Sequence, residues 1–135
     1  MFDKMSWDFI QRSPNENLQT VKARGTFDMD SNAVLIRECL EIANSEGCRA
    51  FLIDNRGLEF QAIKTLEIYS IPSLFSMLKI PRTLHIALVF SEKDAKAFHF
   101  LETVCHNTGY SVFVFADAEA AERRLTVFSL KKNPG

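Results

Sequence analysis

The chain has 135 residues, of which 16 are basic and 17 acidic, so its formal net charge is -1. This balance gives no broad attraction to DNA or RNA, whose binding rests largely on phosphate neutralisation, and we expect no nucleic-acid partner. No run of about 18 apolar residues is present, so we expect no membrane-spanning helix. Three cysteines without a close pair and the lack of a signal-peptide pattern favour reduced thiols in a cytoplasmic protein.

The length favours one domain over 1–135, with a core at about 7–128 and a tail at 129–135. The N-terminal part predicts two strands, at 7–11 and 18–25, because a turn rich in Pro and Asn separates them. In the second strand, small or apolar residues alternate with polar ones. This period of two predicts one buried and one exposed face, as at the edge of a sheet.

A helix is predicted from an acidic cap near Asp28 to about Glu46, where Gly47 can end it. The apolar run 50–53 predicts a buried strand, followed by the turn-like residues 54–57 and an irregular connection over 58–64. The next stretch contains a proline, which breaks helix interiors. We therefore expect a short turn near 66–69 and a helix only from about 70 to 78.

Two further apolar runs, 84–90 and 110–115, predict buried strands on either side of a helix. That helix follows a Ser91-x-x-Asp94 pattern, which resembles a capping box, and a final helix follows Asp117. Strands this uniformly apolar are typical of parallel sheets with helices on both faces. The sequence thus predicts an α/β fold. It has a mixed four- to five-stranded sheet, with an N-terminal antiparallel pair and then parallel strands linked by helices.

Several short motifs resemble those of a known family. They are a TLEIYSIP run over 65–72, Arg82-x-x-His85, Phe98-x-x-x-Glu102, Asn107-x-Gly109 and Asp117-x-x-x-Ala121. With the order of elements, they resemble the STAS-like group of small bacterial proteins similar to anti-sigma-factor antagonists, a group sometimes linked to the CRAL-TRIO lipid-binding fold. The resemblance implies a non-enzymatic regulatory module that binds a protein partner or a small apolar ligand.

The positions that match the phosphorylation site of this family depart from the family pattern. In anti-sigma antagonists a Ser or Thr phosphosite follows the third strand, in an Asp-Ser-[Ser/Thr]-Gly-like motif. The matching positions here read Asp54–Asn55–Arg56–Gly57 and carry no hydroxyl. The nearest candidates are Thr65 and Ser70, where a phosphate would gain from a helix N-terminus.

Polar residues that follow the buried strands form the candidate binding edge, because ligands of open α/β sheets bind beyond the carboxyl ends of the strands. These residues are Asp54, Asn55, Arg56, Ser91, Glu92 and Asp117. One interpretation is a binding edge, with Phe60 on the loop after the third strand; another is a small enzyme or polar-ligand binder that uses Asp54, Arg56, Glu92 and Asp117. A third is that these residues only build turns and caps.

The histidines and cysteines do not predict a metal site or a cofactor. His85 lies inside a buried strand, where a hydrogen-bonded core role is expected. His99 and His106 are seven residues apart on one helix, which separates them by about 10 Å and prevents joint ligation of one ion. Cys105 falls on the apolar stripe of that helix, as a buried, inert thiol would. No catalytic sequence motif is present.

The 12 phenylalanines are more than a core this small obviously needs. Those of interest are Phe60, Phe75, Phe98, Phe100 and Phe128. They are consistent with a core of large residues. They also allow an apolar pocket, or the surface of a homodimer, built by the 58–80 segment and the third helix.

Overall fold

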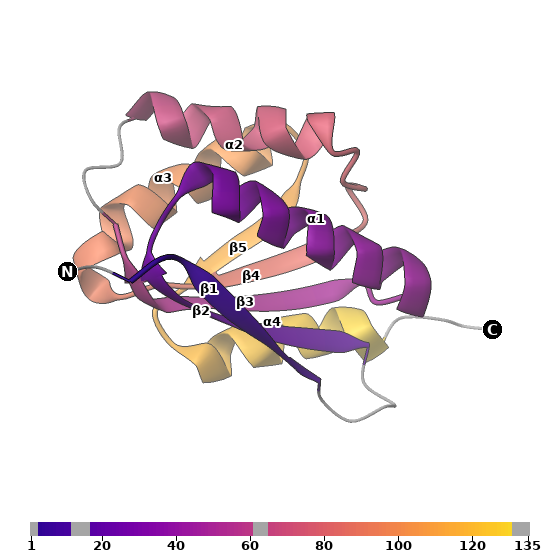
Figure 1. Ribbon diagram of the computed structural model, residues 1–135. Helices are drawn as coiled ribbons and strands as arrows, with labels where there is room; N and C mark the ends of the chain where they lie inside the picture. Colours follow the sequence, from indigo (N-terminus) through magenta and orange to yellow (C-terminus); the bar gives the residue numbers. More distant parts are fainter. Residues whose placement is uncertain (1–2, 12–16, 61–64, 131–135) are drawn as a thin grey trace.

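The computed structural model describes residues 3–11, 17–60 and 65–130 of the chain. Figure 1 shows a central sheet with helices on both of its faces. The elements are β1 (Ser6–Gln11), β2 (Leu18–Thr26), α1 (Met29–Glu46), β3 (Ala50–Glu59), α2 (Thr65–Met77), β4 (His85–Val89), the short 3-10 helix η1 (Glu92–Asp94), α3 (Ala95–Asn107), β5 (Ser111–Phe115) and α4 (Ala118–Leu130). The predicted tail over 131–135 lies outside the described residues, and α4 includes 129 and 130.

The sheet has five strands in the order β1-β2-β3-β4-β5. β1 pairs with β2 in antiparallel orientation, and every later neighbour is parallel. Parallel strands need a crossover connection, and α1, α2 and α3 supply the crossovers. The predicted mixed α/β fold is therefore confirmed.

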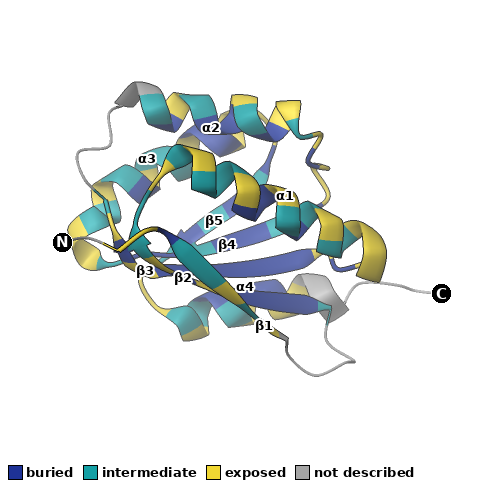
Figure 2. Ribbon diagram, in the orientation of Figure 1, coloured by how far each residue is buried: buried dark blue, intermediate teal, exposed yellow. Residues whose placement is uncertain are grey.

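Alternate residues of the strands face two separate cores. On one face, Phe51 and Ile53 of β3 pack in a large cluster with side chains of α1, α2 and α3. On the other face, Leu52 of β3 packs with Ala121 and Leu125 of α4. Figure 2 shows the dark blue, buried strands between these two helical layers. Burial on both faces explains why β3 begins as a wholly apolar run.

The first helix agrees with its predicted boundaries. The Asp28 carboxylate accepts a hydrogen bond from the Ser31 N–H at 2.9 Å, and Gly47 ends the helix in the left-handed conformation. Asp28 is exposed, and its backbone and side-chain hydrogen bonds to Ser31 lower the pKa of this carboxyl group. The cap predicted before α3 was wrong, because no side-chain cap forms at Ser91 and the chain instead makes the 3-10 turn η1.

The prediction of an edge position for the second strand was also wrong. β2 lies between β1 and β3, and the edge strand is β1. The first four residues of β2, 18–21, are all buried. The reason is that α4 covers the second face of the sheet there, where Leu18 joins its cluster.

The third strand is longer than predicted and carries a bulge. It continues through 54–57 to Glu59 instead of ending in a turn. Between two paired positions, β3 advances from Asp54 to Gly57 while β2 advances only from Lys22 to Arg24, so β3 holds one extra residue. The extra residue lets Leu58 face the same core as Ile53.

The helix around Pro72 is the third correction. α2 runs from Thr65 to Met77 with Pro72 inside it, rather than starting near residue 70. Pro72 has no N–H to donate to the helix, but this loss is offset by the burial of Ile68, Ile71 and Phe75 beneath α2. Of the irregular connection predicted over 58–64, residues 58 and 59 belong instead to β3, and 61–64 lie outside the described residues.

Candidate functional site

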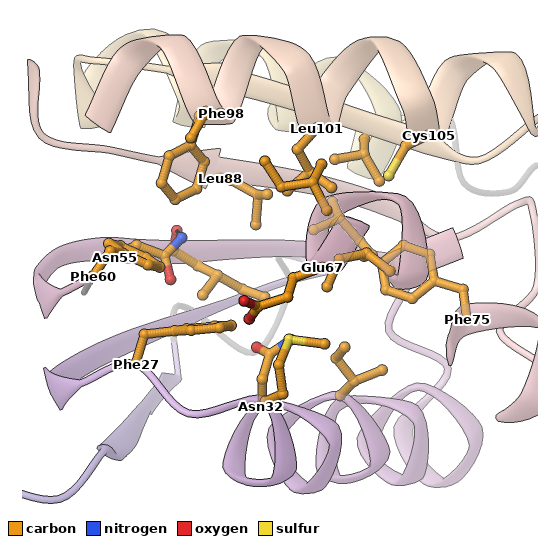
Figure 3. Close-up of a pocket in the computed structure, with 18 residues that line it drawn as sticks. Phe27, Asn32, Asn55, Phe60, Glu67, Phe75, Leu88, Phe98, Leu101 and Cys105 are labelled. Carbon is orange, nitrogen blue, oxygen red and sulfur yellow. Dashed lines mark hydrogen bonds between the residues drawn. The ribbon is translucent and has the colours of Figure 1, made fainter. Parts of the chain in front are cut away.

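An apolar cavity of about 100 Å³ lies between the sheet and the helices α1, α2 and α3. Its apolar walls include Ile53 and Leu88 from the sheet, Ile71 and Phe75 from α2, and Leu101 from α3. Figure 3 shows these elements surrounding the space. Protein interiors hold few voids larger than a water molecule, so a space of this size is a candidate ligand site.

Three polar side chains line the same cavity: Asn32 from α1, Asn55 from β3 and Glu67 from α2. Asn55 is only 8% exposed, and its side-chain amide donates to the Ile53 carbonyl at 3.3 Å. In Figure 3 the Glu67 carboxylate points toward the part of the cavity where Phe27 and Asn32 lie. Polar groups placed in an apolar pocket can orient a ligand.

Aromatic rings form one end of the cavity. Phe60 packs against Phe27, with ring centroids 5.0 Å apart, and against Phe98 at 5.5 Å. Phe60 and Phe98 also line an adjoining open groove of about 480 Å³, together with side chains of η1 and α3 that include Lys96 and Phe100. The rings therefore stand between the cavity and solvent.

Cys105 contributes a thiol to the cavity wall and is fully buried. Burial raises its pKa to about 12, so the thiol is protonated at neutral pH. The predicted buried position of Cys105 is confirmed, and a protonated thiol is a poor nucleophile.

The predicted carboxyl-end residues do not gather in one place. Asp54 and Arg56 bind each other: the Asp54 carboxylate accepts bonds from Arg56 Nε at 2.9 Å and from its terminal nitrogen at 2.8 Å. Their neighbour Asn55 lines the apolar cavity instead. Successive side chains of a strand point to opposite faces, so three consecutive residues cannot form one site here.

Two of the remaining candidates, Asp117 and Ser91, form local hydrogen bonds. Asp117 caps α4 by accepting from the Glu119 N–H at 3.1 Å, and the Ser91 hydroxyl donates to the Arg56 carbonyl at 3.4 Å. Glu92 is exposed on η1. Of these four remaining candidates, Phe60 lines the cavity, as Asn55 does.

Burial acts to raise the pKa of Asp54, but the hydrogen bonds and charge of Arg56, with help from Lys22, outweigh it. The pKa of this carboxyl group therefore lies below its ordinary value of 3.8. The bond to Asp54 is in turn the main cause that raises the pKa of Arg56. The pair is a stable structural element at neutral pH.

We expect Asp54→Asn to lower the free energy of unfolding by about 1 kcal/mol at pH 7, a modest value because Arg56 is 47% exposed. A carboxyl group whose pKa is lower in the folded than in the unfolded state stabilises the fold at pH values above its unfolded pKa. This stabilisation is lost as the pH falls through the folded-state pKa. The difference from the unmodified chain should therefore shrink below pH 3.8 in urea denaturation series.

The matched control is Asp8→Asn, which breaks the exposed Asp8–Arg24 ion pair on β1 and β2. Exposed pairs contribute little, so this change should cost less than about 0.5 kcal/mol at any pH. Equal losses in the two variants would contradict the structural role of the Asp54–Arg56 pair.

Among the described residues, no group of three or more His, Cys, Asp or Glu side chains could hold a metal ion. No helix in that part of the chain is long and apolar enough to cross a membrane. His85 is hydrogen-bonded as predicted, with Nδ1 2.8 Å from the Ser111 hydroxyl.

No protein-family model matches the sequence, and no curated protein sequence matches it either. A solved structure does match the fold. The crystal structure of an anti-sigma factor antagonist from Mycobacterium paratuberculosis covers 90% of this chain and 94% of its own, with a TM-score of 0.58 and 10% sequence identity. This chain has the STAS-like fold. The resemblance predicted from short motifs is thus confirmed at the level of fold.

In this chain, the segment where the resemblance places a phosphosite is part of a strand. β3 continues through Asp54–Asn55–Arg56–Gly57, and none of these residues has a hydroxyl group. The Ser70 hydroxyl is half-buried and donates to the Glu67 carbonyl inside α2. The side chain of Thr65 lies outside the described residues.

The cavity residues that sequence reasoning missed include Phe27, Asn32 and Glu67. Phe27 stands between a strand and a helix, where no periodicity indicates its direction. Asn32 and Glu67 are polar residues in the first turns of α1 and α2, where they are common for reasons of helix capping and dipole. The phenylalanine excess was the one usable signal, and it indicated α2 and α3 but not α1, which also lines the cavity.

Proposed function

We propose that this chain is a non-catalytic regulatory module that binds a small apolar ligand in the cavity between its sheet and α1–α3. The cavity itself carries the proposal, because about 100 Å³ of space has mostly apolar walls. Comparable apolar cavities stay dry and bind small hydrophobic molecules. The adjoining groove gives room for the part of a longer ligand that the cavity cannot hold.

Burial of the ligand would supply most of the binding free energy. Each methylene group removed from water contributes about 0.8 kcal/mol. The rings of Phe60 and Phe98 line both cavity and groove, so a ligand would pass them on its way in. Both rings would stay in contact with the bound chain and exclude water from it.

The non-catalytic part of the proposal is supported by the partners of the polar residues. Asp54 and Arg56 engage each other, and Asp117 caps α4. None of the three lines the apolar cavity. Substrate turnover by the purified chain that Asp54→Ala abolishes would contradict this part.

A protein partner is the second candidate. Tyr69 of α2 is exposed and meets Phe100 of α3 edge to face, with ring centroids 5.2 Å apart. The helices that bear this pair also line the cavity, so a bound ligand could alter the surface that a partner meets. A solved structure with the same fold is an anti-sigma factor antagonist, which supports a protein partner. Light scattering on the purified chain tests whether that partner is a second copy of the chain.

We expect Leu101→Trp to weaken binding of decan-1-ol at least tenfold, because the larger side chain fills the cavity from α3. Isothermal titration calorimetry measures the affinity. Ile71→Phe, a smaller change on the neighbouring helix α2, is a second cavity-filling variant if Leu101→Trp does not fold. Native mass spectrometry of freshly purified protein should show an apolar molecule bound to the unmodified chain and less of it on either variant.

Val127→Trp is the matched control, since Val127 is exposed on α4, on the other face of the sheet. It should bind decan-1-ol as the unmodified chain does. The proposal would be overturned if decan-1-ol failed to bind, or if the cavity-filling variants bound it with unchanged affinity.

A further inference from the structure

Few of the side chains that face the cavity can carry a charge. Its lining holds two ionisable side chains among the described residues, Glu67 and Cys105. The Cys105 thiol is neutral, since its pKa is raised to about 12. Asn32 and Asn55 are neutral amides. The one formal charge in the lining, over the part of the chain that the structure describes, is therefore the negative charge of Glu67.

We propose that the cavity takes an apolar ligand with a cationic, hydrogen-bond-donating head, such as an alkyl ammonium group, and that Glu67 determines this preference. The inference rests on the proposed function, because it names the chemical class of that ligand. An ammonium group has three donors and no acceptor, which complements a carboxylate. A charge-assisted hydrogen bond of this kind is stronger than a neutral one.

The aromatic end of the cavity favours the same charge. Figure 3 shows the Glu67 carboxylate directed toward Phe27, and Phe27 packs against Phe60. The face of an aromatic ring carries partial negative charge and attracts cations. A cationic head near Glu67 would therefore have both a carboxylate and ring faces within its surroundings.

The groove outside the cavity does not supply the opposite preference. Lys93 makes an ion pair with Glu59, with both carboxylate oxygens at 3.0 Å. Asp94 and Lys96 also line the groove. The charges of its two lysines are therefore balanced by Asp94 in the lining and by Glu59, the partner of Lys93. One oxygen of Asp94 is buried and has no hydrogen-bond partner among the described residues. Because it is buried, this oxygen is not accessible to a ligand in the groove.

A fatty acid is the ligand that this arrangement disfavours. Its carboxylate would lie beside Glu67 in an environment of low dielectric constant, where like charges repel strongly. A neutral alcohol of the same length meets no such repulsion. Decylamine, decan-1-ol and decanoate therefore form a series in which only the head group changes.

Calorimetric titration of the full chain at pH 7 with these three probes tests the inference. Decylamine should bind at least tenfold more tightly than decanoate, with decan-1-ol between them. Glu67→Gln keeps the length and polarity of the side chain and should bring decylamine and decanoate within about threefold of each other, with the affinity for decan-1-ol nearly unchanged. Glu46→Gln, at the exposed end of α1, should leave the order of the three affinities as it is.

Each other outcome has a distinct meaning. If decan-1-ol binds but decanoate equals or exceeds decylamine, the inferred ligand class is wrong and the proposed function stands. If decylamine keeps its advantage in Glu67→Gln, the assignment of the preference to Glu67 is wrong. If none of the three probes binds the unmodified chain, the proposed function and the inference both fail.

Discussion

Replacing Gly25 with alanine is expected to lower the free energy of unfolding by about 3 kcal/mol or more. Gly25 has φ of 99°, in a region that residues with a side chain rarely adopt. A Cβ atom there would lie 2.3 Å from the Lys4 carbonyl oxygen, which is backbone and cannot rotate away. The backbone strain and the steric clash with Lys4 therefore both destabilise the Gly25→Ala variant.

The close approach exists because the start of the chain packs along the end of β2. The Thr26 N–H donates to the Asp3 carbonyl at 2.9 Å, and Lys4 and Thr26 form an isolated bridge. Gly25→Ala would push these two segments apart. Urea denaturation followed by circular dichroism measures the loss of stability.

Gly47→Ala is the matched control, because Gly47 has φ of 70° but no atom within 4 Å of the position that a Cβ atom would take. Only the conformational strain applies, and it costs about 1–2 kcal/mol. Equal losses in the two variants would contradict the contact between Lys4 and Gly25.

Phe51→Ala is expected to destabilise the protein by about 3–5 kcal/mol, among the largest effects available to a single substitution. Phe51 is fully buried at 0% exposure and lies on β3, the middle strand of the sheet. It pairs with Gln19 on one side and with Ile86 on the other. Its removal would leave a cavity that the paired strands cannot close.

Ile10→Ala on the edge strand β1 is the comparison for this variant, because Ile10 is 41% exposed. It should cost less than about 1 kcal/mol, since little apolar area is lost from the core. The urea denaturation midpoints of the two variants compare their losses of stability when the slopes of the two denaturation curves are equal. Similar losses for Ile10 and Phe51 would contradict the central position of β3.

Local chemistry made part of the fold predictable from the sequence. Asp28 and Gly47 mark the two ends of α1, because a capping carboxylate and a left-handed glycine act within one turn of the chain. The length of β3 was not predictable in this way. Residues 54–57 favour a turn by composition, but pairing with β2 keeps them extended, and that pairing depends on a distant segment. Pro72 is similar, since burial of the helix face outweighs its missing N–H.

The candidate site was predictable in its position and less so in its chemistry. The phenylalanines indicated a pocket at α2 and α3, and Phe60 lies there. Helical periodicity shows which face turns inward, but not which inward residue meets empty space. Glu67 and Asn32 were therefore missed. Asp54, Asn55 and Arg56 were grouped because they are adjacent, and the extended backbone directs Asn55 away from the other two.

The proposed function requires that an apolar ligand occupies the cavity between the sheet and α1–α3. The most direct measurement is nuclear magnetic resonance of the chain with labelled Ile and Leu methyl groups and bound decan-1-ol. We expect intermolecular nuclear Overhauser effects from the decanol methylenes to Ile71 and Leu101, which line the cavity, and none to exposed Ile10. Effects confined to Ile10 or other exposed methyl groups, with Ile71 and Leu101 silent, would contradict the claim.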